Sequence, residues 1–284
     1  MGRIWKRRAW NAVMRGLLWL SAAVTCALIV FLVCYLFFRG VPSLSWAFLT
    51  SEESVLKGTN GILPAMANTV YVALVSLAVC LPLGVGAAVY LNEYARSRKA
   101  VAVVEFAVEI LAGIPSILYA LVGLLVFSQF LRLQKTLLAA SLTLGVMNLP
   151  VIIRTTQESL KTVPQNWREG VFGLGAGRWR MIRTVVLPGA VDGIVTGCIL
   201  AIGRIVGESA VLLYIAGMGT AMNDFLTAKG FFSASGATLT TMLYLYAKER
   251  ADFGLAFAVA VVLMVLTFLM NLAAELAAGM VKKR

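Results

Sequence analysis

The sequence predicts an all-α polytopic membrane protein with six transmembrane helices, and three observations lead to this fold class. The 284 residues are 60% hydrophobic and 13% charged, with a mean hydropathy of +0.88, whereas soluble domains are nearer half apolar and a quarter charged. Six apolar segments approach the roughly 20 residues that a helix needs to cross a hydrocarbon core of about 30 Å. Basic residues gather in alternate connections between these segments.

The six predicted spans form one membrane domain. They lie near residues 17–38, 66–91, 106–128, 137–153, 189–217 and 253–279. The first follows a basic stretch, but it is too long for the core of a signal peptide and lacks a clear cleavage site, so we interpret it as a retained anchor. No connection is long enough to bury a soluble core. We expect a basic cytoplasmic N-terminus (1–16), a first helix with its outer loop (17–60), a membrane core (61–280) and a basic cytoplasmic tail (281–284).

The net charge of +12 follows the predicted membrane topology. Most of the 25 basic residues precede the first span, follow the second, separate the fourth from the fifth, or end the chain. This distribution is the positive-inside pattern, and it places both termini in the cytoplasm. Topology thus accounts for the basic charge. We expect contact with membrane lipids and no nucleic-acid partner.

Groups that serve catalysis or metal binding are scarce. The sequence has no histidine, which removes the usual general base and the commonest metal ligand. The cysteines form no C-x-x-C pair, so we expect neither a metal site nor a disulfide framework. All four fall within predicted spans: Cys26, Cys34, Cys80 and Cys198. A membrane-embedded enzyme is therefore the weakest of the function classes considered.

Proline interrupts three of the spans. Pro82 lies in the second, Pro115 in the third and Pro150 near the end of the fourth. Each removes a backbone hydrogen bond, which is tolerated at membrane depth where protein or a water-filled cavity compensates. The stretch "LAGIPSIL" (111–118) predicts a break or kink, which suits a transport pathway and simple packing equally well. The apolar stretch 239–246 is too short to cross and predicts an interfacial helix.

The longest cytoplasmic connection, 154–188, contains "NWREGVFGLG", which predicts a short helix stopped by Gly173 and Gly175. Its spacing resembles the EAA loop of the membrane subunits of bacterial ABC importers. The positions that correspond to the pattern are Glu169, Gly170, Val171, Gly175, Leu187 and Pro188, and of these Glu169, Gly175, Leu187 and Pro188 match it. Gly170 and Val171 replace the two alanines of that pattern, and Val185 replaces its isoleucine.

The resemblance implies that the helix around Glu169 is a coupling helix, which docks on a separate ATPase. The alternative is an amphipathic helix that lies at the interface with ordinary lipid contacts. The chain has no G-x-x-x-x-G-K-[ST] motif for binding phosphates and magnesium. We therefore expect no bound cofactor in this chain, and ATP with Mg²⁺ in a partner ATPase.

Four further segments are similar to the permeases of the high-affinity phosphate importer: "YLNEYAR" (90–96), "EILAGIPSILYALVGLLVF" (109–127), "MNLPVIIRTTQESLKTVP" (147–164) and "ILAIGRIVGESAVLL" (199–213). A fifth stretch near the C-terminus, "LYLYAKERADFGLAFAVAVVLMVLTFLMNLAAEL" (243–276), is more similar to the A-type permease of that importer than to its C-type companion. The likeness extends from about residue 62 to the C-terminus. It implies the type I permease fold in the bacterial inner membrane. It also implies a second, related permease, a cytoplasmic ATPase dimer, and a periplasmic or surface-anchored phosphate-binding protein.

Arg204 and Glu208 are two charges within an apolar span. Their spacing predicts i, i+4 neighbours on one helix face, bordered by Gly203 and Gly207. Charges at membrane depth usually mark a pathway, and a guanidinium fork suits phosphate oxygens. Glu208 would hold the arginine and temper its affinity. The alternative is an ion pair that locks helix packing, and both roles can hold in different transport states.

Arg154, at the inner end of the fourth span, is a second pathway candidate. An ordinary positive-inside anchor is an equally good interpretation of this residue. The leading function is an ATP-driven phosphate importer working by alternating access. The alternative from another class is a proton-coupled secondary anion transporter that uses Glu208 and Arg204.

Overall fold

In a computed structural model, the protein is described for residues 2–53 and 59–282. The regular secondary structure of these residues is helical, with no strand among them. Four described helices are long and apolar enough to cross a membrane. They are α1 (Gly2–Gly40), α3 (Leu63–Val89), α6 (Leu137–Thr162) and α14 (Phe253–Lys282). Each coincides with a predicted span. α6 continues well beyond 153, where the prediction ended.

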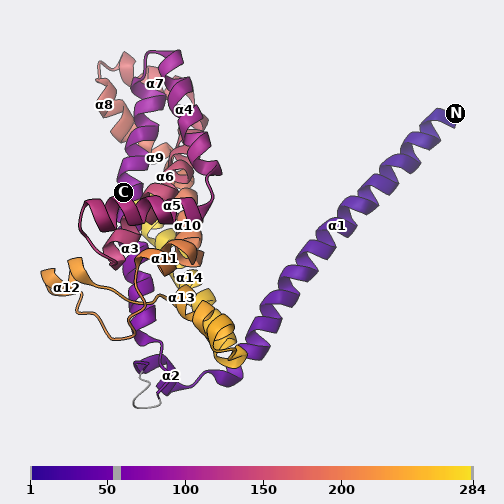
Figure 1. Ribbon diagram of the computed structural model, residues 1–284. Helices are drawn as coiled ribbons and strands as arrows, with labels where there is room; N and C mark the ends of the chain where they lie inside the picture. Colours follow the sequence, from indigo (N-terminus) through magenta and orange to yellow (C-terminus); the bar gives the residue numbers. More distant parts are fainter. Residues whose placement is uncertain (1, 54–58, 283–284) are drawn as a thin grey trace.

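Two further spans are bent pairs of helices, which brings the total to six if each pair crosses once. α4 (Arg98–Gly113) meets α5 (Ser116–Gly123) and its π-helical continuation η3 (Leu124–Phe130) at 99°. The stretch Arg178–Gly189, made of α8 (Arg178–Met181), η4 (Ile182–Val186) and α9 (Leu187–Gly189), meets α10 (Val191–Gly207) at 63°. Figure 1 shows α5 lying across the bundle instead of continuing along α4.

The break between α4 and α5 confirms the interruption predicted at 111–118. Ile114 and Pro115 have extended backbone, with ψ values of 129° and 140°, because proline disfavours helical geometry in the residue before it. The Tyr119 hydroxyl donates to the Leu111 carbonyl at 2.8 Å, which satisfies an acceptor freed at the end of α4. Pro82 and Pro150, in contrast, lie inside the continuous helices α3 and α6.

The centre of the molecule is the contact of α3, α6 and α10. Small residues let these helices approach: a Cβ added at Gly84 of α3 would come within 2.6 Å of the Ile152 side chain on α6. A largely buried core runs along this contact and includes Cys80, Leu144 and Ile152. α10 therefore packs against both α3 and α6.

α1 leaves the bundle, as Figure 1 shows, and the apolar window of this span is entirely unburied within the chain. Its contact with α14 lies at its outer end. There the ring of Tyr35 meets that of Phe257 edge-on at 5.7 Å, and Gly40 approaches the Phe257 backbone. Lipid or another subunit must cover the remaining apolar surface.

Short helices complete the outer side: η1 (Val41–Ser43), α2 (Trp46–Thr50), α11 (Ala210–Ile215), α12 (Ala228–Ser233), α13 (Leu239–Tyr244) and η5 (Leu245–Glu249). The helix expected over 239–246 is present. Its Leu239, Met242 and Tyr246 are almost completely buried, so it packs within the bundle and does not lie on its surface. Burial raises the pKa of the Tyr246 phenol to about 12. The Arg250 guanidinium lies over this ring and pairs with Glu53.

Candidate functional site

Arg204 lies on α10, about 20 Å along the helix from its beginning at Val191, at a rise of about 1.5 Å per residue. Its side chain is half-buried. The guanidinium interacts electrostatically with the Tyr119 phenol of α5, the residue that bridges the α4–α5 break. Arg204 makes no ion pair within the described part of the chain. The site thus contains an unneutralised cation beside an interrupted span.

Arg204 and Glu208 form no ion pair among the described residues. α10 ends at Gly207, and Glu208 has extended backbone at φ −76°, ψ 126°. Its carboxylate accepts a hydrogen bond from the Ala210 amide at 3.0 Å, in the first turn of α11. The helix thus ends just before Glu208, and the carboxylate turns toward the backbone that follows it instead of toward the Arg204 guanidinium.

Gly203 and Gly207 face open space, since a Cβ added at either would meet no atom within 4 Å. Their expected role of leaving room beside the charges fits this placement. The Glu208 carbonyl accepts a hydrogen bond from the Thr240 hydroxyl at 3.2 Å, and α11 packs on α5. The α4–α5 break and the break between α10 and α11 at Glu208 are therefore close to each other and to Arg204.

Arg154 is not brought to this site. It lies on α6 and approaches Glu109 of α4 at 3.6 Å, with both side chains more than half exposed. The surrounding pocket, of about 400 Å³, also contains the carboxylates of Glu105 and Glu158. Carboxylates oppose a phosphate anion at this position. The structure gives Arg154 an ion-pair partner of its own.

The loop expected to contain the coupling helix has one anchored face and one exposed face. α7 (Gln165–Gly173) carries Glu169 and Gly170 on the exposed side, next to Trp167 and Phe172, which are 54% and 45% exposed. Among the described residues Glu169 has no hydrogen bond or ion pair. The exposed face is therefore charged and aromatic, and available for contact.

Gly175 ends α7, as the sequence predicted. Its φ of +75° lies in the left-handed region that favours glycine. The Gly175 amide donates to the Phe172 carbonyl at 2.9 Å, and the Ala176 amide donates to the Val171 carbonyl at 3.2 Å. This pair of bonds is a Schellman motif.

Val171 and Leu187 belong to the anchored face. Both pack on an inner hydrophobic cluster that includes Ala88 of α3 and Leu160 of α6. Pro188 is exposed and lies in α9, just before the 63° bend into α10. The six predicted loop positions thus divide: two pack against the spans, Gly175 shapes the turn, and the others face outward.

Sequence reasoning missed an ion pair at the base of α7. Arg168 Nη2 lies 3.0 Å from Glu93 Oε1, and the two side chains are 13% and 8% exposed. Both residues lie in segments that carry the family resemblance, "NWREG" and "YLNEYAR", but the sequence assigned no role to either residue. An acidic residue within a connection dominated by cations was the available signal.

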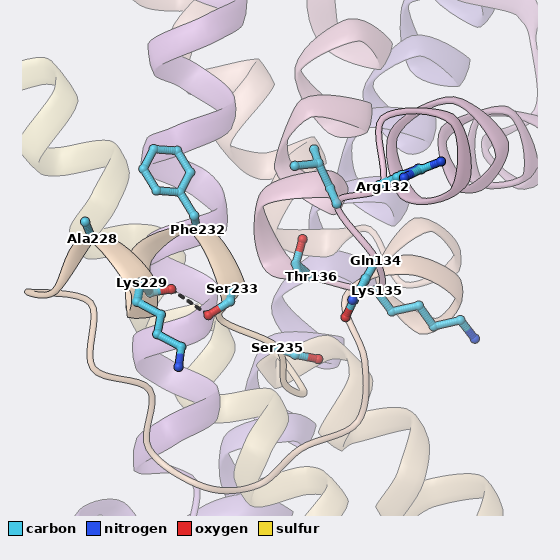
Figure 2. Close-up of a pocket in the computed structure, with 10 residues that line it drawn as sticks. Arg132, Gln134, Lys135, Thr136, Ala228, Lys229, Phe232, Ser233 and Ser235 are labelled. Carbon is cyan, nitrogen blue, oxygen red and sulfur yellow. Dashed lines mark hydrogen bonds between the residues drawn. The ribbon is translucent and has the colours of Figure 1, made fainter.

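The outer side contains a cavity of about 840 Å³ between the loop before α6 and α12. Arg132, Lys135 and Lys229 line it together with Thr136 and Ser235. Figure 2 shows Lys135 and Lys229 on opposite walls, extending in different directions. The cations therefore do not converge on one anion. No group of three or more acidic or cysteine side chains suited to a metal occurs in 2–53 and 59–282.

The sequence matches a family described as binding-protein-dependent transport system inner membrane component, over residues 80–282. The probable ABC transporter permease protein YqgI of Bacillus subtilis is 34% identical over 81% of this chain and 78% of its own length. The phosphate transport system permease protein PstA 1 of Mycobacterium tuberculosis is 32% identical over 95% of this chain and 89% of its own.

Solved structures confirm the fold. A chain of a bacterial alginate ABC transporter, solved with a periplasmic protein bound to an alginate pentasaccharide, matches with a TM-score of 0.66 at 17% identity. The match covers 96% of this chain and 98% of that one. A chain of the inward-facing methionine ABC transporter MetNI matches with a TM-score of 0.59 at 22% identity, over 78% and 94% of the two chains. This chain is a multi-pass ABC transporter permease that belongs to the binding-protein-dependent transport system inner membrane component family.

Proposed function

We propose that this chain is the A-type permease of an ATP-driven phosphate importer and that Arg204 receives the anion within the bilayer. The observation that carries the proposal is the half-buried Arg204 guanidinium, which has no ion-pair partner within the described residues and lies near the α4–α5 break and the end of α10 at Gly207. A charge at the bilayer centre costs at least about 2.5–3.5 kcal/mol. Relatives named as phosphate transport permeases support the choice of substrate.

The chemistry of the site suits an anion that binds and leaves. The planar guanidinium donates two parallel hydrogen bonds to phosphate oxygens, and helix breaks at membrane depth are a common place for substrate binding. The Glu208 carboxylate is engaged with the Ala210 amide, so Arg204 is left to the substrate. The negative charge of the Glu208 carboxylate lowers the affinity of the site for phosphate, which favours release of the anion.

Energy for transport comes from outside the chain. The exposed face of α7, with Glu169, Trp167 and Phe172, provides a compact docking element for a cytoplasmic ATPase dimer that binds ATP and Mg²⁺. A second, related permease completes the pathway. A periplasmic or surface-anchored binding protein delivers phosphate to the outward-open state in the bacterial inner membrane.

Phosphate uptake by proteoliposomes containing the complete transporter tests the proposal. Arg204→Gln should lower uptake by about 10- to 100-fold, the loss expected for one or more hydrogen bonds to a charged group. Arg204→Lys, which keeps the charge and loses the fork, should lower it less. Arg39→Gln, at the exposed outer end of α1, is the matched control and should leave uptake unchanged. Normal uptake by Arg204→Gln would contradict the role of this residue.

The energy source separates the two transport classes. Uptake should stop when ATP is removed and persist when an uncoupler collapses the proton gradient. Uptake that survives ATP removal and fails with the uncoupler would favour the proton-coupled alternative, to which membership of this family gives no support.

A further inference from the structure

The Arg168–Glu93 pair joins parts of the chain that are distant in sequence. Arg168 lies on α7, and Glu93 lies in η2 (Tyr90–Tyr94), the π-helical turn at the end of α3. Compared with the Arg154–Glu109 and Arg250–Glu53 pairs, this is the one in which both side chains are less than one-fifth exposed. A covered ion pair is weakly screened by salt, so its geometry is held firmly.

The same guanidinium also holds the end of α6. Arg168 Nη2 donates to the Leu160 carbonyl at 2.8 Å, and Nη1 donates to the Val163 carbonyl at 3.3 Å. These carbonyls lie in the last turn of α6 and beyond it, where acceptors have no partner within the helix. One side chain therefore connects α7, α6 and η2.

The acidic partner is positioned as well. The Asn92 side-chain amide donates to Glu93 Oε1 at 2.7 Å. On the returning leg of the loop, the Arg178 guanidinium lies 5.5 Å from the centre of the Tyr94 ring. Both legs of the loop thus contact η2, around a cavity of about 350 Å³ that contains Glu93, Arg168 and Arg178.

The two spans differ in how they are attached to α7. α6 ends at Thr162 and is joined to α7 through only Val163 and Pro164, so any movement of α7 reaches α6 along the backbone. α3 has no such covalent connection. The Arg168–Glu93 pair is the ionic link from α7 to the end of α3. α3 in turn packs on α10, which carries Arg204.

We propose that Arg168 and Glu93 are positioning residues that make α3 move together with α7. The ion pair carries displacement of α7 into α3 and from there to α10, so that hydrolysis and opening of the site remain coupled. This inference rests on the proposed function, since the force on α7 comes from the partner ATPase. The residues touch neither phosphate nor ATP.

The test uses the complete transporter in proteoliposomes and measures ATP hydrolysis, phosphate uptake and co-purification of the ATPase. Arg168→Gln and Glu93→Gln should retain the ATPase and hydrolyse ATP, while phosphate imported per ATP falls on the order of 10-fold, in the range of typical coupling energies. Arg183→Gln removes an exposed charge from the same loop and should leave this ratio unchanged. The double variant Glu93→Arg/Arg168→Glu should restore part of the ratio.

The outcomes are distinguishable. Wild-type transporter that shows no ATP-dependent phosphate uptake contradicts the proposed function and this inference with it. Normal wild-type uptake with an unchanged ratio in Arg168→Gln contradicts the inference alone. If Arg168→Gln loses the ATPase, Arg168→Lys is measured as well. An Arg168→Lys transporter that retains the ATPase but still imports less phosphate per ATP supports the inference. Loss of the ATPase with a normal ratio in Arg168→Lys and Glu93→Gln overturns it, because the pair would then only stabilise the fold.

Discussion

Polar side chains of α3 hold the outer segment between α11 and α13 against the bundle, and Asn68 is fully buried among them. The Asn68 side chain donates to the Ala237 carbonyl at 2.8 Å and accepts from the side-chain amide of Asn223 at 3.0 Å. The neighbouring Thr69 hydroxyl accepts from the Leu239 amide at 2.9 Å. These bonds hold the start of α13 against α3.

Asn68→Leu should therefore destabilise the protein by about 1–3 kcal/mol, since it leaves the buried Ala237 carbonyl without this donor and removes one of the two acceptors of the Asn223 side-chain amide. Thermal unfolding of the purified protein in detergent measures the effect as a lower Tm. Asn11→Leu, at an exposed position of α1, is the control and should leave Tm unchanged. Equal Tm values for the two variants would contradict the role of Asn68 as a fastener.

At this scale the sequence identifies charges but not their partners. Arg204 stands out because a cation within an apolar run is costly. The i, i+4 spacing suggested Glu208 as its partner, whereas the Glu208 carboxylate accepts a hydrogen bond from the Ala210 amide, beyond the end of α10. Arg168 and Glu93 are 75 residues apart, so no local pattern relates them.

Among the elements, α7 depends on one glycine for its end. A residue with a Cβ at the left-handed position of Gly175 costs roughly 1–2 kcal/mol, whereas Gly173 is the last residue of α7 and faces open space. Alanine at position 173 should favour the helix by up to about 1 kcal/mol. The two glycines therefore form a matched pair.

Gly175→Ala should speed hydrogen exchange of the amides of α7, and Gly173→Ala should slow it. Exchange measured by mass spectrometry on the purified transporter follows both. A change in the same direction in the two variants would show that the turn does not control the helix. Weaker association with the ATPase should accompany only the first.

Proline illustrates what an element's sequence does and does not determine. Pro115 breaks its span, while Pro82 and Pro150 remain inside helices. Near Pro115 the Gly113 and Ser116 neighbours offer helix-ending and helix-starting chemistry, and the Tyr119 hydroxyl satisfies a freed carbonyl. α3 and α6 instead pack along each other on both sides of their prolines. The composition of a span locates a possible break, and the packing around the proline determines whether the helix is interrupted there.

For the whole molecule, hydropathy predicted the number of spans, and charge predicted their orientation. The 99° turn of α5 across the bundle was not predictable, because hydropathy reports depth and carries no direction within the membrane. The buried position of α13 also depends on α3, which is remote from it in sequence. Positions of this kind arise from long-range packing.

The attachment of α1 to the bundle is a property of the whole chain and depends on Gly40. An added Cβ would lie 2.5 Å from the Phe257 carbonyl oxygen, a backbone atom with little freedom to move. Gly40→Ala should weaken the contact by about 1–3 kcal/mol, as overpacking does. Gly16→Ala, on the same helix with no atom within 4 Å, is the control.

Cross-linking of Tyr35→Cys with Phe257→Cys measures the contact, because these rings meet in the native protein. The cross-link should form more slowly in Gly40→Ala and at the normal rate in Gly16→Ala. An unchanged rate in Gly40→Ala would show that α1 is held by other contacts.

The bare flank of α1 has a consequence for how the protein is made. A helix that has an intramolecular neighbour only at its outer end can partition from the translocon into lipid by itself, long before the ribosome has synthesised α14. The basic residues ahead of it then retain that end on the ribosome's side. The orientation of every later crossing is thus decided during translation, by a segment that contributes almost nothing to the finished core.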